Sequence, residues 1–360
     1  MIRNFIILST PVAPLWNPVA GGVTQMVHAL VKAATEFSEE VTVIAPKGSV
    51  LTLTSDNIQL LEVAGVFARH AYDGGTEQSE HIADVLQGML EEARKMAGEG
   101  DVIISLAYDY PAFSAAGLYP DTPLLHYVTM ALEDSETKQA ITTLATDCPA
   151  HVAFMSAAQA AFFIGNRQAN ILPMGIEFAA YALNLVPKPI LCWAGRISPE
   201  KDVGFAMHVA HTLHLPLRVI GAVQDDVYWE SCKSAYPAVQ LEHMGFMETN
   251  TFQHVLGEAS VFLMTSSWLE AFGIVVLEAQ ACGVPVVCYE GTGAAEIVRH
   301  GITGYVVKRM DRQGFIQATR DAMQLRRESC RNDVQKRLDF GVFKQNLQAW
   351  VQRAFTARYR

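Results

Sequence analysis

Charge is scarce in this chain of 360 residues, since only 18% are charged whereas 50% are hydrophobic. This balance excludes a disordered polypeptide and leaves enough apolar surface for two buried cores, because a domain takes about 150 residues. The formal net charge is −10, so neither a basic face for nucleic acid nor attachment to an anionic membrane surface is indicated. We therefore expect small-molecule substrates as partners and no nucleic acid.

Paired metal ligands are also missing. The six cysteines form no CxxC pair and stand mostly among apolar residues, at positions 148, 192, 232, 282, 288 and 330. This pattern favours reduced, buried thiols in a cytoplasmic protein over disulfides or a metal site. Asp225 and Asp226 lie in a polar, helix-like stretch that does not suit a metal. We expect no metal and no cofactor.

Long apolar runs are absent as well, and none reaches the about 18 residues that a membrane span needs. The chain opens with one arginine and a short apolar stretch that Pro11 and Pro14 soon end. This stretch is too short for the core of a signal peptide and predicts a first buried strand instead.

What the chain does have is a regular alternation of short β-branched runs with longer helical patterns. Several runs are apolar throughout, which is typical of parallel strands buried on both faces. The runs lie at 5–8, 41–44, 102–105, 124–127, 152–155, 190–193, 217–220, 261–264 and 285–289. Helical patterns such as 22–36 and 273–281 lie between them. The alternation predicts an α/β protein with two doubly wound, Rossmann-like domains.

The predicted domain boundary lies in the stretch 173–189, which contains three prolines and no strong periodicity. We expect a first domain over 1–175 and a second over 176–342. Residues 343–360 form an amphipathic pattern with basic residues toward the end, which predicts a C-terminal helix.

Two short features of the first half each have two interpretations. Gly21 and Gly22 open a helix after a proline-rich loop, where glycines let a phosphate approach backbone N–H groups. A glycine pair alone favours a tight turn, and the pattern is not the GxGxxG of a dehydrogenase. His126 stands near the end of a buried strand. It is either a packed core histidine or a site residue at that strand end.

A charged loop, GRISPEKD at 195–202, follows the strand predicted at 190–193. Arg196 and Lys201 would therefore lie at the carboxyl end of a strand, where open α/β sheets bind ligands. A guanidinium fork and an ammonium group suit a diphosphate. Charged loops are common, so solvation of the loop is the alternative explanation.

The strongest signal is the segment WLEAFGIVVLEAQACG at 268–283. It predicts Glu270 in a loop after a strand and Glu278 inside an apolar helix that ends at Gly283. An all-helical spacing would separate the two by about 12 Å, too far for the roughly 5–9.5 Å of a glycosidase pair. The spacing suits a grip on the two ends of a nucleotide sugar, with the diphosphate at the helix N-terminus. Burial of Glu278 is costly without a partner, which favours function over a purely structural role.

Together these motifs resemble the retaining glycosyltransferases of family four, which have the GT-B fold of two Rossmann-like domains facing across a cleft. The resemblance covers nearly the whole chain. It rests most on the glutamate pair in EAFGIVVLEAQACGVPVV, and further on GRISPEKD, on GGVTQMVHALVKAA followed by VTVIAP, and on EIVRHGITGYVV. One departure is Met174 in ILPMGIE, where the family has asparagine. The resemblance implies an acceptor-binding first domain, a donor-binding second domain, and a C-terminal helix that packs back on the first.

The resemblance also implies how the donor is held. Arg196 and Lys201 hold the diphosphate, and Glu270 binds hydroxyls of the transferred sugar, helped by backbone N–H groups at Phe272 and Gly273. The remaining implied contacts are Gly21, Gly22 and Gly195 at the phosphates, Met244 and Gly245 at the base, Glu278 at the ribose and His126 at the reacting sugar.

Several first-domain stretches are similar to those of pteridine glucosyltransferases, which use UDP-glucose and tetrahydrobiopterin. They are STPVAPLW, APKGSVL and AYD at 107–109. A flat pterin needs aromatic stacking and a carboxylate or amide for its amino-pyrimidine edge, which Trp16, Tyr108, Asp109 and Tyr110 could supply. Packing of the tyrosines on the domain surface is the alternative, and so is a lipid or glycan acceptor.

The predicted reaction retains the anomeric configuration and needs no metal, because Arg196, Lys201 and a helix dipole stabilise the departing UDP. A nucleotide-sugar epimerase and a phosphorylase are alternatives on the same fold, although no pyridoxal lysine site is found. A non-catalytic nucleotide-sugar-binding protein is a further alternative, against which the intact Glu270 and Glu278 weigh. The sequence leaves the sugar and the oligomeric state open.

Overall fold

The computed structural model describes residues 2–15, 22–64, 76–115, 119, 121–131 and 134–358, with side chains for all of these except 76–81 and 358. Its contacts divide the chain into two compact units. Unit 1 comprises Met1–Met174 with Gly341–Arg360, and unit 2 comprises Gly175–Phe340. Most of the proline-rich stretch 173–189 therefore belongs to unit 2.

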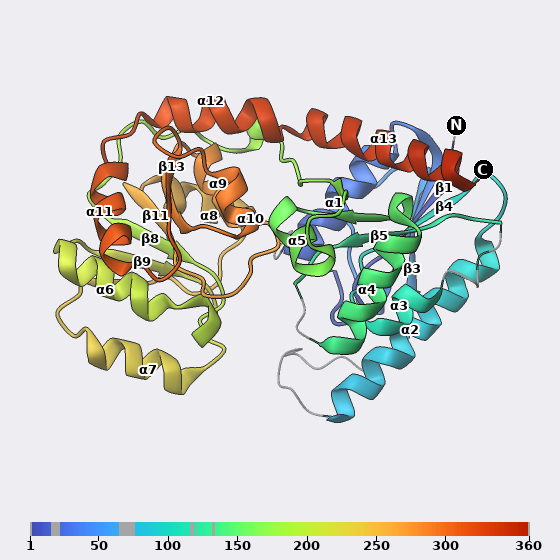
Figure 1. Ribbon diagram of the computed structural model, residues 1–360, viewed down its shortest axis with the longest axis horizontal. Coiled ribbons are helices and arrows are strands. Elements are labelled where there is room, and N and C mark those ends of the chain that lie inside the picture. The colour runs from blue at the N-terminus through green and yellow to red at the C-terminus, as the bar shows by residue number, and fades with distance from the viewer. Residues whose placement is uncertain are drawn as a thin grey trace. The chain divides into compact units, whose positions relative to one another are not determined.

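Within the described residues, unit 1 has a parallel sheet of seven strands in the order β3-β2-β1-β4-β5-β6-β7 (Figure 1). The strands are β1 Ile2–Leu8, β2 Ser38–Pro46, β3 Ile58–Val63, β4 Val102–Ser105, β5 Leu124–Val128, β6 Val152–Phe154 and β7 Asn170–Ile171. The five runs predicted as strands in the first half all lie in this sheet. The sequence reading missed β3, which is only half-buried, and β7, which has two residues.

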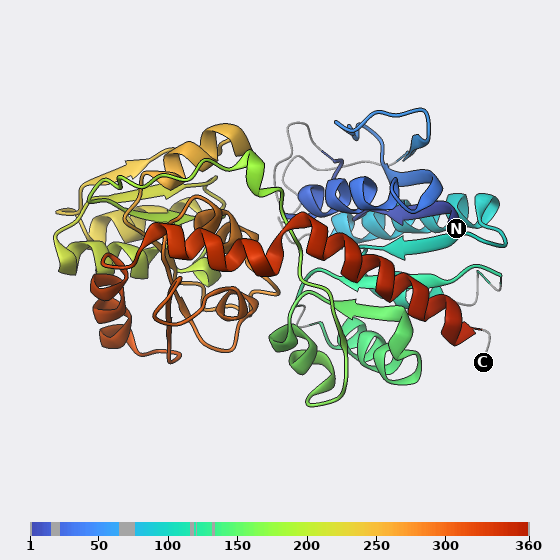
Figure 2. The same cartoon turned by 90° about the horizontal axis from the view of Figure 1, so that it is seen from above.

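Helices cover both faces of this sheet. They are α1 Gly22–Ala34, α2 Thr76–Met96, α3 Tyr110–Ser114, α4 Ser135–Asp147, α5 Ala157–Ile164 and α13 Phe340–Arg358. Helices α2 to α5 share one apolar core, whereas α1 and α13 lie on the opposite face, as Figure 2 shows from above. The buried ring of Trp350 fixes α13 there, 6.2 Å from the ring of Tyr127, and donates a hydrogen bond to the Ala150 carbonyl at 2.9 Å.

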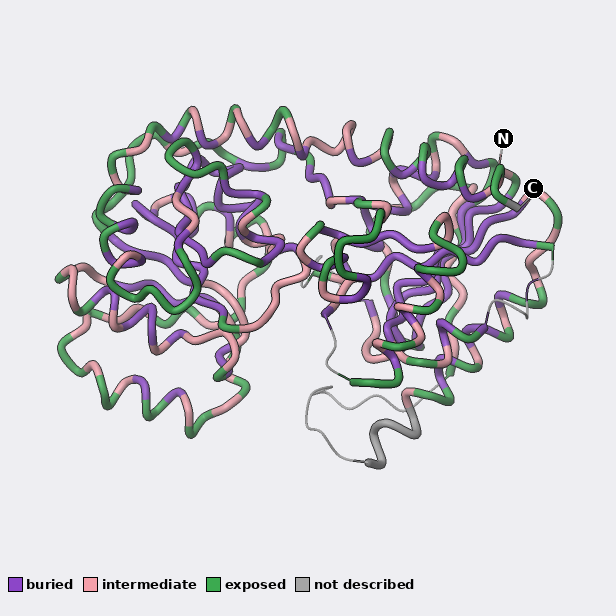
Figure 3. Tube along the Cα trace, viewed as in Figure 1, coloured by how far each residue is buried: buried purple, intermediate pink, exposed green. Residues whose placement is uncertain are grey.

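Unit 2 has a second parallel sheet, with six strands in the described part of the chain, in the order β10-β9-β8-β11-β12-β13. The strands are β8 Leu191–Ala194, β9 Leu217–Ile220, β10 Leu241–His243, β11 Val261–Met264, β12 Val286–Tyr289 and β13 Gly304–Val307. The four runs predicted in the second half are all present. Strands β11 and β12 are buried along their whole length (Figure 3), as their uncharged, mostly apolar sequences predict. Strand β9 is also buried throughout, although it contains Arg218.

The helices of unit 2 again form two layers. They are η3 Phe178–Ala180, η4 Pro199–Lys201, α6 Val203–Leu213, α7 Asp226–Ala235, α8 Thr249–Gly257, α9 Ile274–Ala281, α10 Gly293–Ile297, α11 Arg312–Ala322 and α12 Arg327–Leu338. Helices α6, α7 and α11 share one core, and α8, α9 and α12 pack on the other face (Figure 1).

In each sheet the strand order reverses at one point, between β1 and β4 in unit 1 and between β8 and β11 in unit 2. Loops that follow neighbouring strands diverge at such a point and leave room at the carboxyl ends, where open α/β sheets bind ligands. The site residues are therefore to be sought just after Leu8, Ser105, Ala194 and Met264.

The cysteines and the helices test two earlier expectations. All six cysteines are free, and five are buried as predicted. The prediction is wrong for Cys148, which is exposed where α4 ends. Among the described residues no helix is both long and apolar enough to cross a bilayer.

Candidate functional site

The loop after β8 carries the first predicted group of unit 2. The Gly195 N–H donates to the Ile220 carbonyl at 3.0 Å, which joins this loop to the end of β9. The Arg196 side chain is 39% exposed; its Nη1 donates to Gln224 Oε1 at 2.8 Å, and its Nη2 lies 3.7 Å from Glu200 Oε1. This guanidinium is accessible to an anion in solution.

Lys201 and Glu270, which are 69 positions apart, form an ion pair in which the ammonium donates to Glu270 Oε1. The side chains are 20% and 15% exposed, so the pair is largely shielded from water. Backbone bonds hold the two loops together, since the Ser267 N–H donates to the Glu200 carbonyl at 3.0 Å. The Thr265 hydroxyl also donates to the Lys201 carbonyl at 3.1 Å. The loops after β8 and β11 thus form one charged surface.

Gly273 precedes α9 and has a φ of +94°, which a glycine adopts without strain. A Cβ at this position would lie 3.2 Å from the Ala294 Cβ. The Phe272 side chain is buried, so only backbone N–H groups at 272–273 can serve a ligand here. Because α9 begins at Ile274, Glu270 lies in the loop before the helix and Glu278 lies inside it, as predicted, so the distance of an all-helical spacing does not apply.

Glu278 lies inside α9 and is only 4% exposed. Its Oε1 accepts a hydrogen bond from the Tyr181 hydroxyl at 3.1 Å. A phenol from the segment that precedes β8 is therefore one of the partners that stabilise this buried carboxylate.

The loop after β10 brings two apolar side chains to the same edge of the sheet. Met244 is 40% exposed and Phe246 is 63% exposed. Gly245 between them has a φ of +65° and accepts from the Gly221 N–H at 2.8 Å, which ties this loop to the one after β9. Exposed apolar side chains at a sheet edge suit a flat heterocycle.

His126 lies in β5 of unit 1 and is 1% exposed. Its ring packs against that of Phe113 with 5.0 Å between the centroids, and neither ring nitrogen has a hydrogen-bond partner in the described structure. Burial, with a smaller contribution from the charge of His151, lowers the pKa of His126 to about 3. The ring is therefore neutral at pH 7 and offers one donor and one acceptor.

Two further buried polar atoms without a partner in the described structure accompany His126: Asp109 Oδ2 and Thr129 Oγ1. Asp109 follows β4 and Thr129 follows β5, and these strands are neighbours with Ser105 opposite His126. Burial raises the pKa of Asp109 to about 6, against a backbone hydrogen bond that lowers it. Native proteins rarely leave such groups unsatisfied. Three at one edge indicate a place for a polar ligand.

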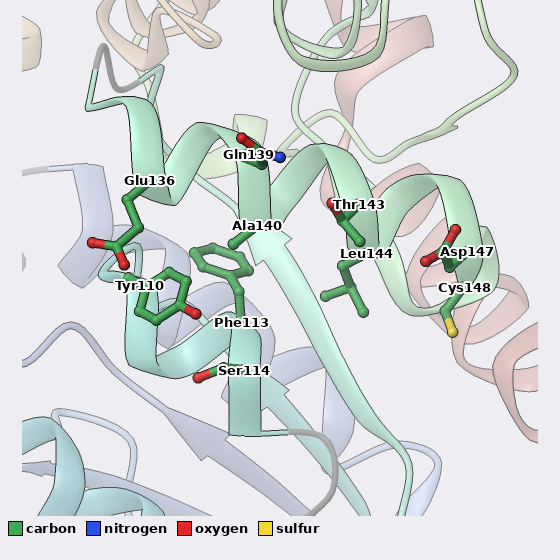
Figure 4. A pocket seen from close by; sticks show the side chains of 10 residues that line it. All are labelled: Tyr110, Phe113, Ser114, Glu136, Gln139, Ala140, Thr143, Leu144, Asp147 and Cys148. Atoms are coloured by element: carbon green, nitrogen blue, oxygen red, sulfur yellow. The ribbon is translucent and has the colours of Figure 1, made fainter.

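The aromatic residues beside Asp109 differ in exposure. Tyr108 is 9% exposed, which leaves little of its ring for stacking, whereas Tyr110 is 41% exposed. Tyr110 lines a groove of about 530 Å³ between α3 and α4 that extends from Glu136 to Cys148 (Figure 4). Gly22 is the exposed first residue of α1. The predicted site residues Trp16 and Gly21 lie outside the described residues.

The sequence reading thus missed Tyr181, Thr129 and the serine that joins the two charged loops, Ser267. Tyr181 could have been noticed in the sequence as a tyrosine in a stretch without periodicity. That signal is weak, because the sequence does not show which side chain its hydroxyl contacts. Within the described residues, no cluster of three or more His, Cys, Asp or Glu side chains could hold a metal ion.

The comparison with protein families bears on unit 2. Residues 181–337 match the family model of glycosyl transferases group 1. The matched stretch contains both charged loops, and with them Arg196, Lys201, Glu270 and Glu278. This part of the chain therefore has the sequence pattern of the group 1 glycosyltransferases.

Among curated relatives, the alpha-maltose-1-phosphate synthase of Mycolicibacterium smegmatis is 30% identical over 129 residues, which are 33% of this chain and 33% of that protein. The chain spans about a third of the length of the first curated relatives that it matches.

Solved structures match over almost the entire chain. AviGT4, a glycosyltransferase involved in avilamycin A biosynthesis, has a TM-score of 0.72 at 19% identity, over 100% of this chain and 98% of its own. Anabaena HepE in complex with UDP-glucose has a TM-score of 0.71 at 15% identity, over 97% and 99%. These likenesses establish the predicted fold class, two parallel-sheet Rossmann-like domains as in GT-B glycosyltransferases.

Proposed function

We propose that the protein is a cytoplasmic, retaining, metal-independent glycosyltransferase that moves a hexose from a UDP-sugar, UDP-glucose in the first instance, to a small acceptor such as the reduced pterin tetrahydrobiopterin. The observation that carries this proposal is the Lys201–Glu270 pair, placed before the N-terminus of α9. A cation, a carboxylate and free helix N–H groups are what a sugar diphosphate needs. Support also comes from the match of the same segment to the group 1 family.

On the donor side, Lys201 and Arg196 would neutralise the diphosphate and Glu270 would bind hydroxyls of the sugar. Met244 and Phe246 would flank the base, and Glu278 would bind the ribose. The bond between the anomeric carbon and the phosphate oxygen breaks, with charge building up on the departing UDP. Fixed cations and N–H groups stabilise that charge without reorganising.

On the acceptor side, the hydroxyl oxygen would bond to the anomeric carbon from the face that the phosphate leaves. Its proton passes to the departing phosphate oxygen, so no side-chain base is required. The unpartnered atoms of Asp109 and Thr129 would take up the polar edge of the acceptor, and the neutral ring of His126 would contact the reacting sugar. A pterin offers N–H and carbonyl groups that match a carboxylate and a hydroxyl.

The test is to incubate the purified protein with UDP-glucose, with and without tetrahydrobiopterin, and to measure UDP release and product mass. We expect pterin-dependent release and a pterin heavier by one hexose. Slow release that does not depend on pterin would overturn the pterin acceptor and direct the search to lipid or glycan acceptors. No release from any of several nucleotide sugars would overturn the transferase proposal in favour of a binding protein.

Asp109→Ala separates the two substrates in this assay. We expect it to remove the pterin dependence while the slow, acceptor-independent release of UDP persists. Asp134→Ala is the matched control in the same unit, because Asp134 caps α4 by accepting from the Thr137 N–H at 2.7 Å and serves no proposed site. Equal effects of the two variants would contradict the acceptor role of Asp109.

A further inference from the structure

The hydrogen bond between Tyr181 and Glu278 joins two buried side chains of unit 2 that are 97 positions apart. The residues are 8% and 4% exposed. Burial, together with the neighbouring Glu278 charge, raises the pKa of Tyr181. The phenol therefore keeps its proton and remains a donor to the carboxylate throughout the working pH range.

The backbone on both sides of Tyr181 is held by a side-chain amide. Gln253 of α8 accepts from the N–H of the residue after Tyr181 at 2.9 Å. It also donates to the carbonyl of the residue before Tyr181 at 2.7 Å. This bracket fixes the peptide from which the phenol extends, although the segment has no regular secondary structure at this residue.

A guanidinium holds the same segment against the helix that carries Glu278. Arg331 of α12 donates to the Tyr181 carbonyl at 2.6 Å and to the Ala281 carbonyl, the last of α9, also at 2.6 Å. The backbone of Tyr181 and the end of the helix that carries Glu278 are therefore held together by the same arginine. A purely space-filling aromatic would need neither the hydroxyl nor this double fixation.

The bond from the Tyr181 hydroxyl restricts the orientation of the Glu278 carboxyl plane. A carboxylate accepts up to about four hydrogen bonds, so one bond from a phenol orients it without exhausting its capacity. Binding of two vicinal hydroxyls is sensitive to that orientation, because both bonds must form at once.

We propose that Tyr181 is a positioning residue that orients Glu278 for the vicinal hydroxyls of the donor's ribose, and so sets the preference for a ribonucleotide over a 2′-deoxyribonucleotide. This inference rests on the proposed function, since it takes the ligand of Glu278 to be the donor nucleotide. Tyr181 itself touches no substrate in this account.

The test compares the binding of UDP and 2′-deoxy-UDP to the full-length protein and to Tyr181→Phe by titration calorimetry. Loss of a hydrogen bond to a charged group should weaken UDP binding about tenfold. Binding of 2′-deoxy-UDP should change by less than about twofold, because it lacks one of the two hydroxyls and a single bond depends less on the orientation of the carboxyl plane. In the transfer assay, KM for the UDP-sugar should rise with kcat unchanged.

Two variants guard against a general structural effect. Tyr119→Phe removes another buried phenol bond, to the Leu90 carbonyl at 2.7 Å in unit 1, and should leave both nucleotides unaffected. Gln253→Ala releases the bracket without touching the phenol, and should reduce the preference for UDP in the same direction by a smaller factor.

The outcomes separate the inference from the function on which it rests. Equal weakening of both nucleotides by Tyr181→Phe, or no weakening of either, would overturn the positioning role while wild-type discrimination leaves the donor site standing. A wild-type protein that binds both nucleotides equally would overturn the role of Glu278, and the inference with it.

Discussion

The polar side chains at the carboxyl edges of the two sheets differ in whether they have partners within the protein. At the edge of unit 2, Lys201 and Glu270 neutralise each other. At the edge of unit 1, polar atoms of Asp109, His126 and Thr129 are buried with no partner in the described structure. Among the described residues of unit 2, one buried side-chain atom has no hydrogen-bond partner, the amide oxygen of Gln280 inside α9.

This difference follows from the charges involved. A buried ammonium or carboxylate without a counter-charge is far more costly than an unpaired neutral group. A permanently charged site therefore needs internal partners that a ligand must displace. His126 and Thr129 are neutral at pH 7, so they can remain unpaired at a lower cost until a ligand binds. Asp109 is the exception, because its unpaired carboxyl group ionises above a pKa of about 6 and then destabilises the ligand-free protein. Ligand binding in unit 2 should thus replace the Lys201–Glu270 ion pair with bonds to the ligand. Ligand binding in unit 1 should form hydrogen bonds with groups that had no partner before.

The largest effect expected from this comparison is that of Lys201→Ala. Loss of a fixed cation at the departing diphosphate should lower kcat by about 100- to 1000-fold. The measurement is UDP release at saturating donor. The control is Lys188→Ala in the same unit, since the Lys188 side chain is 59% exposed and its ammonium pairs with Glu258 at 2.7 Å. Full activity of both Lys201→Ala and Arg196→Ala would refute the proposed mechanism.

The next effect is on stability: Asp109→Asn should raise the free energy of unfolding of unit 1. The raised pKa of Asp109, about 6 instead of 3.8, means that the native state binds the proton more tightly than the unfolded state. The stability of the wild type therefore falls as pH rises from 3.8 to 6 and stays low above that. The variant lacks this loss and should gain up to about 3 kcal/mol at pH 7, since each unit of pKa corresponds to about 1.4 kcal/mol.

Urea unfolding at several pH values between 4 and 7 checks this prediction, with near-equal stability expected at the acid end. Asp134→Ala serves as the control of opposite sign, because the Thr137 bond lowers the pKa of that exposed carboxyl. A gain for Asp109→Asn that is the same at every pH would mean that desolvation of the carboxylate is not its cause.

The smallest effect is expected for Glu270→Gln, which releases Lys201 from its internal partner. An ion pair of this kind contributes up to about 1 kcal/mol, so UDP should bind about three- to fivefold more tightly while sugar transfer falls. Calorimetry with UDP measures the first effect. The control is Glu242→Gln, whose carboxylate pairs with Arg218 at 3.0 Å and should leave UDP binding unchanged. Weaker UDP binding by Glu270→Gln would contradict the exchange of partners in unit 2.

Much of the fold could be predicted because its signal is local. The run 261–264 is apolar at every position, and the structure has β11 at Val261–Met264, buried on both faces. The same logic fails for β3, whose burial is partial, and for Cys148, whose exposure depends on where α4 ends. A short sequence pattern predicts the strand or helix that contains it, but it does not predict which other elements pack on that strand or helix.

The candidate site divides in the same way. The residue types and their places after β8 and β11 were readable from GRISPEKD and from the glutamate motif, because a loop that follows a parallel strand lies at a known edge of the sheet. Their pairing was not readable. The bonds of Lys201 to Glu270 and of Tyr181 to Glu278 join residues 69 and 97 positions apart.

The sequence by itself determined that this protein is an α/β chain with two parallel sheets, and it placed cations and carboxylates at the carboxyl end of the second. Hydrophobic periodicity and the alternation of strands and helices along the chain suffice for that, since both depend only on residues that are near in sequence. Only the tertiary structure decided which of those groups are paired and which are left buried without a partner. That distinction depends on side chains from distant segments meeting in a low-dielectric interior, where each contact changes the cost of burial.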